Sequence, residues 1–508
     1  MNKIDLIAKE ISNLYKDVSS KRWVQYTTGF DLGITDAENR VKDYKKNPEM
    51  YKLVLNALVS QVSPLEKRKA EILNKSIKDY HLSDKVKKIK DEIDVLENSL
   101  MDILNKFRSQ IDGKEVSSTE REKILSQSAD RNLRQKAYES NLPLNQILVD
   151  HGFLKLVNLR KELAAESGAD NFVDYVLDQE DLNLDLFRDW ATICEQRSSK
   201  YQSKSNELAE RYLKVDCLMP WDQKYVENQI CSLNETQVDM TNFQDLMTKT
   251  FSKFDFDLSK LNLTYDIFPR KNKSEWGYHF TIEMGKDSRI LANVSNRFSD
   301  YWVLLHETAH GTHYMGLNPE ENILNWGVSG ILAEGFANFF GNQCYSKEFL
   351  SEVFRDNYED AFHEFKKLDS FTHYKNYRIV PDILFDQQLY LKDLNSANDL
   401  QELRQSIGKQ VLGEGGYTVP WARLIHHTSH PIYLHNYFLG DVMSENMKKE
   451  FSKRFPGKKA EENPDQFGRF WKSELLNPSG KDPFLKLYKN VFNTDLSITD
   501  YIDSKCLA

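Results

Sequence analysis

Apolar residues recur at helical spacings along almost the whole chain. Over residues 82–107 they repeat at intervals of four and three, with lysine and acidic side chains on the other faces. Similar patterns cover 130–138 and 156–164, and they resume from Ser299 to the C-terminus around a glycine-rich loop at 413–416. The sequence therefore predicts a mainly α fold.

The alternation typical of strands is confined to the middle of the chain. Apolar and polar residues alternate from Tyr278 to Met284, and a turn at 285–287 leads into a second apolar run at 289–294. This pattern predicts a hairpin within a small sheet.

The composition of the chain argues against binding to nucleic acid and against insertion into a membrane. The 508 residues contain 68 Lys plus Arg and 77 Asp plus Glu, a formal charge of −9 that disfavours nucleic acid. No apolar stretch reaches the ~18 residues of a membrane span, and the N-terminus lacks a secretory pattern. The five cysteines are scattered without a C-x-x-C pair, which predicts a reduced, cytoplasmic protein. The oligomeric state stays open.

A metal-binding motif lies in the second half of the chain. His306 and His310 are four residues apart, so on a helix both imidazoles share one face and can reach a single ion. Glu307 is placed beside them, to contact water on that ion rather than the ion itself. The alternative is an ordinary pair of helix-face histidines.

Spacing selects the third ligand, because a catalytic zinc needs three protein ligands and an open position. The metzincin pattern fails: it requires glycine at 313 and histidine at 316, and the chain has the reverse. Thermolysin and aminopeptidase spacings require Glu near 329 or 330, where Ser329 and Gly330 stand.

The next carboxylate in a helical context is Glu334, 24 residues beyond His310. It lies in an apolar run, where an unpaired carboxylate is costly to bury. Glu320 and Glu321 have the character of carboxylates in a first helical turn. Asn338, one turn after Glu334, is a candidate for orienting a metal-binding histidine.

With Glu334 at that spacing, the motif resembles the thimet oligopeptidase/oligoendopeptidase F family of zinc peptidases, with angiotensin-converting-enzyme-like features. Thr308-Ala309 departs from the residue pair usual inside the motif. The resemblance is strong over 270–445. Segments similar to the oligoendopeptidase F block with the catalytic His and Tyr are Trp421–His427, Pro431–Tyr433 and Tyr437–Gly440. Segments similar to the converting-enzyme stretch are Ser274–Trp276 and Gly285–Ile290.

The resemblance implies roles for these residues. Tyr437 would donate a hydrogen bond to the oxyanion formed during peptide hydrolysis. Its partner would be His426, 11 residues earlier, or His427 if the converting-enzyme spacing applies. Tyr433 would be a secondary substrate contact. Independently of the resemblance, His279 on the predicted strand is expected to face substrate, because an edge strand can pair with an extended peptide. The alternative is that both tyrosines are helix-packing aromatics.

The resemblance also implies the architecture: a helical, two-lobed zincin of the gluzincin type, with a deep substrate cleft and a small sheet near the zinc helix. Residues 1–250 would roof the cleft, and 251–508 would form the catalytic half. One Zn²⁺ per chain would bind His306, His310 and Glu334.

The predicted function is hydrolysis of short, unstructured oligopeptides with Glu307 as general base. Endopeptidase and dipeptidyl-carboxypeptidase action both stay open. One alternative is a catalytically inactive helical peptide-binding or scaffold protein with a vestigial metal site. Another is a partner-binding coiled coil built on residues 82–107.

Overall fold

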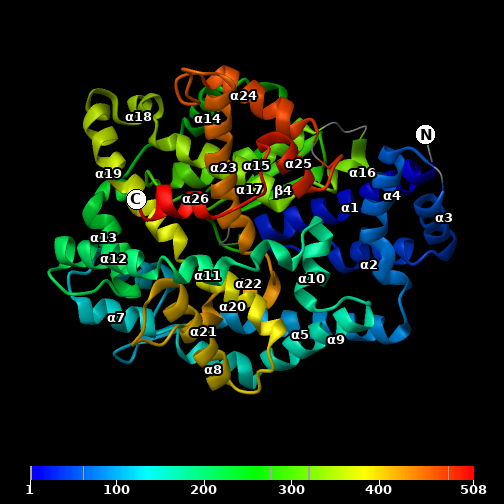
Figure 1. Ribbon diagram of the computed structural model, residues 1–508, viewed down its shortest axis with the longest axis horizontal. Coiled ribbons are helices and arrows are strands. Elements are labelled where there is room, and N and C mark those ends of the chain that lie inside the picture. Colours follow the sequence, from blue (N-terminus) through cyan, green and yellow to red (C-terminus); the bar gives the residue numbers. More distant parts are fainter. Residues whose placement is uncertain (1–2, 61, 275–276, 318–320, 479) are drawn as a thin grey trace. The chain divides into compact units, whose positions relative to one another are not determined.

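The computed structural model describes residues 3–508 except 61, 275–276, 318–320 and 479, and helices dominate it (Figure 1). The predicted mainly α fold is confirmed. The chain forms two compact units, each assembled from three segments. The first comprises Met1–Ser83, Glu235–Phe362 and Leu439–Leu496; the second comprises Asp84–Asn234, His363–Phe438 and Ser497–Ala508. The predicted roofing role of residues 1–250 stays a prediction.

Helices make up most of both units. In the first unit they are α1 (Lys3–Thr28), α2 (Ile34–Lys45), α3 (Pro48–Val59), α4 (Pro64–Ile77), α14 (Phe243–Lys253), α15 (Asp300–Gly316), α16 (Asn322–Asn325), α17 (Gly330–Gly341), α18 (Lys347–Phe354), α24 (Pro464–Trp471) and α25 (Phe484–Phe492). In the second they are α5 (Asp84–Lys106), α6 (Ser118–Gln127), α7 (Arg131–Glu139), α8 (Pro143–Asp150), α9 (Phe153–Glu166), α10 (Phe172–Leu177), α11 (Trp190–Glu195), α12 (Ser198–Leu213), α13 (Gln223–Ile230), α20 (Val380–Leu391), α21 (Ala397–Leu412), α22 (His426–Ser429) and α26 (Thr499–Tyr501). Two helices have residues in both units: α19 (Tyr358–Tyr377) and α23 (His435–Arg454).

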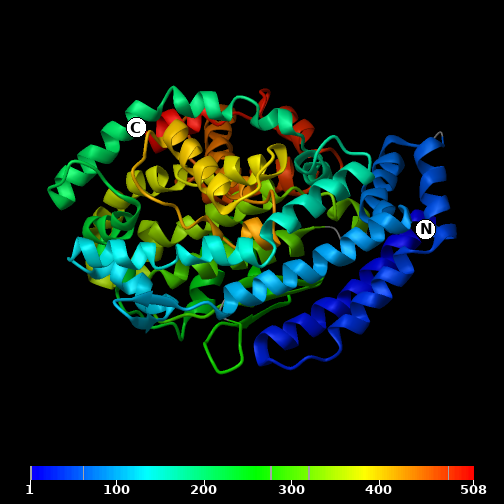
Figure 2. The same ribbon diagram turned by 90° about the horizontal axis from the view of Figure 1, so that it is seen from below.

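The N-terminal helices begin where the sequence provides caps. Asn47 accepts hydrogen bonds from the first turn of α3, and Ser63 forms a capping box with Glu66 at the start of α4. Helices α1 and α2 lie side by side (Figure 2), joined through Val18, Ala37 and Val41.

The predicted central hairpin is confirmed and belongs to a three-stranded sheet in the first unit. Strands β4 (Tyr278–Glu283) and β5 (Asp287–Leu291) are antiparallel, and β3 (Leu263–Asp266) pairs with β5 in parallel. The order β3-β5-β4 makes β4 an edge strand, with a register shift between Thr281 and Glu283. The sequence did not predict β3.

Helices cover both faces of this sheet. On one face Trp23 of α1 packs with Ile282 and edge-on against Phe280. On the other face lies α15, whose Gly311 allows close approach: a Cβ there would lie 3.0 Å from Leu263 Cδ2. The sheet therefore fixes the helix that carries the H-E-x-x-H motif.

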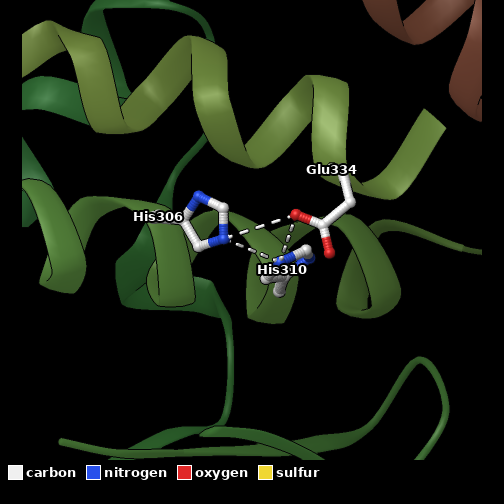
Figure 3. A group of neighbouring side chains, drawn as sticks. All are labelled: His306, His310 and Glu334. Atoms are coloured by element: carbon white, nitrogen blue, oxygen red, sulfur yellow. Dashed lines mark hydrogen bonds and ion pairs between the residues drawn. The ribbon is translucent and has the colours of Figure 1, made fainter. Parts of the chain in front are cut away.

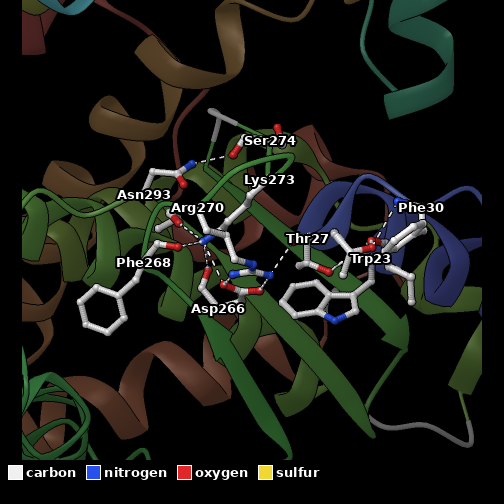
Figure 4. Close-up of polar contacts among 12 residues, drawn as sticks. Trp23, Thr27, Phe30, Asp266, Phe268, Arg270, Lys273, Ser274 and Asn293 are labelled. Atoms are coloured by element: carbon white, nitrogen blue, oxygen red, sulfur yellow. Dashed lines mark hydrogen bonds and ion pairs between the residues drawn. The ribbon is translucent and has the colours of Figure 1, made fainter.

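A buried lysine fastens the loop that follows β3 (Figure 4). The Lys273 ammonium donates to the carbonyl oxygens of Asp266, Phe268 and Ala292, at 2.9, 2.9 and 2.6 Å. It also pairs with the Asp266 carboxylate at 3.0 Å. The Lys273 charge is thus paired with a carboxylate, and its N–H groups bind carbonyl oxygens at or just after the ends of β3 and β5.

The second unit confirms the long helix predicted at 82–107, which is α5 and lies against α9. The prediction that strands occur only in the middle of the chain is wrong. Strands β1 (Ser109–Ile111) and β2 (Lys114–Val116) form a small hairpin. Its turn is Asp112-Gly113, both with positive φ, as a tight two-residue hairpin requires.

Candidate metal centre

The three predicted ligands converge from two neighbouring helices (Figure 3). His306 and His310 lie on α15, and Glu334 lies on α17. The two Nε2 atoms are 3.2 Å apart, and Glu334 Oε2 lies 3.6 Å from His306 Nε2 and 3.7 Å from His310 Nε2. The structure thus brings together the donors that sequence spacing selected.

These distances fit a small transition-metal ion. A point equidistant from the three donor atoms lies about 2.0 Å from each, close to the ~2.0–2.2 Å bonds that zinc makes with His nitrogen and carboxylate oxygen. Two nitrogens and one oxygen suit zinc, whereas calcium and magnesium prefer oxygen ligands.

Burial keeps both imidazoles neutral, as metal ligands must be. It holds the pKa of His306 well below its usual range, and the neighbouring His310 adds to this effect. Burial also lowers the pKa of His310 to about 4. Glu334 is only 4% exposed, so the carboxylate and the imidazoles share an environment in which charge is costly unless matched.

Neighbouring side chains hold the ring of His306 in place. Trp302 stacks on it, with ring centroids 4.8 Å apart, and the indole N–H donates to Asn342 at 3.0 Å. Asn338 donates to the Asp441 carboxylate at 2.9 Å, and its proximity partly offsets the lowering of the His306 pKa. The role predicted for Asn338, orienting a metal-binding histidine, stays a prediction.

Glu307 faces the same cluster. Burial and, to a lesser extent, the nearby Glu334 carboxylate raise its pKa to about 8, and the His279 backbone N–H partly offsets this rise. A cation bound by the neighbouring donors would favour the ionised form. The pKa of this carboxyl thus depends on what the cluster holds.

A close helix contact positions Glu334. Gly440 of α23 packs against α17 so tightly that a Cβ there would lie 2.9 Å from both Glu334 Cβ and Gly335 N. Gly335 is equally confined, because its Cβ would lie 3.0 Å from the Gly440 carbonyl oxygen. The two glycines let the helices meet at the ligand itself.

Other candidates lie outside the donor cluster. His279 stacks on Tyr314, with ring centroids 5.4 Å apart, and its Nε2 lies 3.2 Å from Ser288 Oγ. His313 is fully buried, and burial lowers its pKa to about 3. Glu321 pairs with Lys69 at 3.4 Å. Glu320, Glu275 and Trp276 lie outside the described residues.

The second unit groups the residues that the family resemblance singled out. His426 Nε2 lies 3.3 Å from the Tyr437 hydroxyl. Tyr433 stacks on His426 at 6.3 Å and meets Tyr437 edge-on at 5.4 Å. Burial, aided by neighbouring histidines, lowers the pKa of His426 to about 4, so it is neutral near pH 7.

His427 has different partners. It is 1% exposed, and its Nδ1 lies 3.3 Å from the Asp386 carboxylate. Asp386 also accepts the Ile432 backbone N–H at 2.6 Å. Ile432 has φ 60°, a conformation that a β-branched residue rarely adopts. Buried Arg160 donates to the carbonyl oxygens of His427 and Thr428.

Asp386 and Arg160 therefore hold the turn between α22 and α23 from two sides. Sequence reasoning missed both residues. Each comes from a distant helix, and neither stands in a motif that links it to the turn.

Comparison with known proteins identifies the fold. No family model matches the chain, and no curated protein matches its sequence. A carboxypeptidase from Pyrococcus furiosus, described as apo-Mg, is similar with a TM-score of 0.69 and 16% identity over 99% of this chain and 98% of that chain. An M32 carboxypeptidase from Deinococcus radiodurans R1 gives 0.67 and 11% over 99% and 97%. A Bacillus anthracis str. Ames protein assigned as an oligoendopeptidase F gives 0.69 and 16% over 99% and 90%. The mainly α zincin fold is thereby confirmed.

Proposed function

We propose that this protein is a zinc-dependent peptidase that hydrolyses short, unstructured oligopeptides. The observation that carries the proposal is the convergence of His306 Nε2, His310 Nε2 and Glu334 Oε2 within 3.7 Å of one another. The fold that holds these donors is shared with a carboxypeptidase and a protein assigned as an oligoendopeptidase F.

We propose one zinc ion per chain, held by these three residues. The Pyrococcus structure is described as apo-Mg, but magnesium takes octahedral oxygen coordination and the donors here are two imidazoles and one carboxylate. Three protein ligands leave a coordination position open, as in catalytic rather than structural zinc sites.

The chain's own groups would divide the chemistry. When bound, zinc supplies Lewis acidity that lowers the pKa of a neighbouring water toward ~7 and polarises a carbonyl group. Glu307 would take a proton from the attacking water and return it to the leaving amine. Tyr437 and His426 would donate hydrogen bonds to the oxyanion, with Tyr433 as a further substrate contact. His427 stays a candidate by its converting-enzyme spacing.

Incubation with a mixed peptide library, with and without a chelator, tests the proposal. We expect products identified by mass spectrometry only without chelator, and Glu334→Ala should lose both zinc and products. Full zinc content in Glu334→Ala would contradict the third ligand. Peptide binding without products would favour the inactive peptide-binding protein.

The products also settle the mode of cleavage. Stepwise loss from the C-terminus indicates a carboxypeptidase, and internal cuts indicate an endopeptidase. We expect peptides of roughly 5–20 residues to be preferred, because a single domain offers a limited length of strand-like contact. Equal rates for one sequence, free and embedded in a folded carrier, would contradict the preference for short, unstructured substrates.

A further inference from the structure

A pocket of about 500 Å³ lies within the first unit, beside the edge strand β4. Its walls come from α1, the end of α2, α4 and α16, and from four consecutive residues of the sheet, 281–284. Alternate side chains of a strand point to opposite faces. Four consecutive residues can therefore line one pocket only along the free edge of the strand or at its end.

The basic residues of this pocket outnumber the acidic ones. Four lysines and two carboxylates line it. Glu283 is matched by Lys16 at 2.5 Å and Lys286 at 2.8 Å. Asp5 is matched by Lys69 at 3.2 Å. The positive charges left for a ligand are those of Lys9, which is exposed, and Lys45, which is buried.

Lys45 is buried without a counter-charge. It is 4% exposed, and its ammonium donates to the Tyr15 hydroxyl at 2.9 Å and lies over the rings of Tyr15 and Tyr80. Within the described part of the chain it forms no ion pair. The equally buried Lys273 has a carboxylate and three carbonyl oxygens (Figure 4). A buried charge is ordinarily paired. An anionic group of a bound ligand would supply the partner that Lys45 lacks among the described residues.

The pocket also presents an unused hydrogen-bonding group. The Ser76 hydroxyl oxygen is buried and has no hydrogen-bond partner among the residues that the structure describes. Ser76 and Lys45 come from different helices, α4 and α2, and both line the same pocket. An anion with several oxygens would satisfy both groups.

The edge of β4 links this pocket to the metal centre. His279 of β4 lies beside the metal centre: the centroid of its ring is 6.2 Å from that of His310, and its backbone N–H lowers the pKa of Glu307. Among the described residues β4 pairs with β5 along one edge only, which leaves its other edge available for pairing. At about 3.4 Å per residue, the stretch 281–284 lies roughly 7–17 Å from His279.

We propose that an extended peptide pairs with the edge of β4 and places an acidic group in this pocket, against Lys45. Backbone pairing at a sheet edge supplies affinity that does not depend on sequence, and a side pocket supplies selectivity. The anionic group would lie roughly two to five residues from the scissile bond, the distance set by the strand rise. The inference rests on the proposed peptidase function and specifies its substrate class.

A positional scan of one peptide tests the proposal. A peptide hydrolysed by the zinc-loaded enzyme is remade with a single Glu or Gln at each position, and kcat/KM is measured for every pair. We expect a window in which Glu exceeds Gln by about tenfold or more, the effect of a hydrogen bond to a charged group. Peptides ending in a free acid or an amide show whether a terminal carboxylate serves equally.

Variants assign the effect to the pocket. Lys45→Met should bring the Glu/Gln ratio close to one. Lys67→Met is the matched control: it removes the same charge from an exposed position of α4 outside the pocket and should keep the ratio. The ratio in the unaltered enzyme needs no variant, so it still decides if Lys45→Met does not fold.

The two proposals fail in different ways. Hydrolysis with no window of Glu preference, or a preference retained in Lys45→Met, overturns the pocket proposal and leaves the peptidase proposal standing. No hydrolysis of any peptide overturns the peptidase proposal. Binding of the same labelled peptides then decides the pocket: about tenfold tighter binding with Glu supports it, and equal binding overturns it.

Discussion

Gly440→Ala should weaken zinc binding without touching a ligand. The new Cβ would lie 2.9 Å from Glu334 Cβ and 3.0 Å from the Glu334 carbonyl carbon. Carbon atoms favour separations of ~3.5–4.0 Å, so α17 and α23 must separate by about 0.6 Å or more. Metal–ligand distances tolerate only about ±0.2 Å. Glu334 would then fall short of the ion that it is proposed to bind.

Two opposing terms set the effect on folding. Alanine in place of glycine within a helix ordinarily adds about 1 kcal/mol to the free energy of unfolding. Overpacking costs about 1–3 kcal/mol, and the upper part of that range applies because the obstructing atoms are backbone or Cβ atoms. We therefore expect a net loss of about 1–2 kcal/mol in urea denaturation. We also expect about 10–100-fold weaker zinc binding, measured by competition with a fluorescent chelator.

Gly408→Ala is the matched control. Gly408 lies inside α21, and its Cβ would meet only the end of the Arg404 side chain, at 3.3 Å. We expect zinc affinity to stay unchanged and the free energy of unfolding to rise by up to about 1 kcal/mol. Unaltered zinc affinity in Gly440→Ala would refute the argument that the glycine contact positions Glu334.

Three further predictions concern chemistry and pH. Glu307→Gln should keep zinc, measured by metal analysis, and lower turnover by at least ~10³, because the proposed base is lost; normal turnover would assign the proton to another group. Tyr437→Phe should keep zinc and lower kcat by ~10²–10³, whereas a change in KM alone would make Tyr437 a binding residue only. The third concerns His313, whose pKa of about 3 in the folded protein lies below the usual 6.5. The unfolded chain then binds more protons between these values, so the free energy of unfolding falls as pH drops from 6.5. In the metal-free protein, His313→Leu should remove up to ~1.4 kcal/mol of that fall per pH unit, and equal pH slopes for both proteins in urea denaturation would contradict this.

The sequence predictions that the structure confirms are those based on local periodicity. The stripe over 82–107 became α5, and the alternation at 278–284 became β4, because periodicity depends on neighbours a few residues apart. Strand β3 was not predicted from the sequence, because only its pairing with β5, more than twenty residues later, distinguishes it from a loop. The small hairpin at 109–116 is not predicted, because each of its strands has only three residues and shows no clear alternation.

In the candidate site, too, the features set by local spacing could be predicted, and those set by contacts between distant segments could not. His306 and His310 share a face of one helix, so their four-residue spacing is enough to predict that their side chains converge. Glu334 required a choice among carboxylates, and the apolar character of its run pointed to it. The resemblance gave His426 as the partner of Tyr437 and kept His427 open, and the structure places His426 beside Tyr437. That His427 contacts Asp386 instead could not be predicted, because the surroundings of adjacent residues on a short helix depend on the tertiary structure.

The protonation state of Glu307 depends on the charges that surround it at the metal centre. Glu334 is buried between two neutral imidazoles, and the nearby Glu307 has a pKa of about 8, raised by burial and by Glu334. Without a cation, two carboxyls in one dry environment cannot both ionise cheaply, so Glu307 holds a proton near neutral pH. A dication at the three donors would favour ionisation of both. Occupancy would therefore convert Glu307 from a proton holder into the base that the proposed chemistry needs.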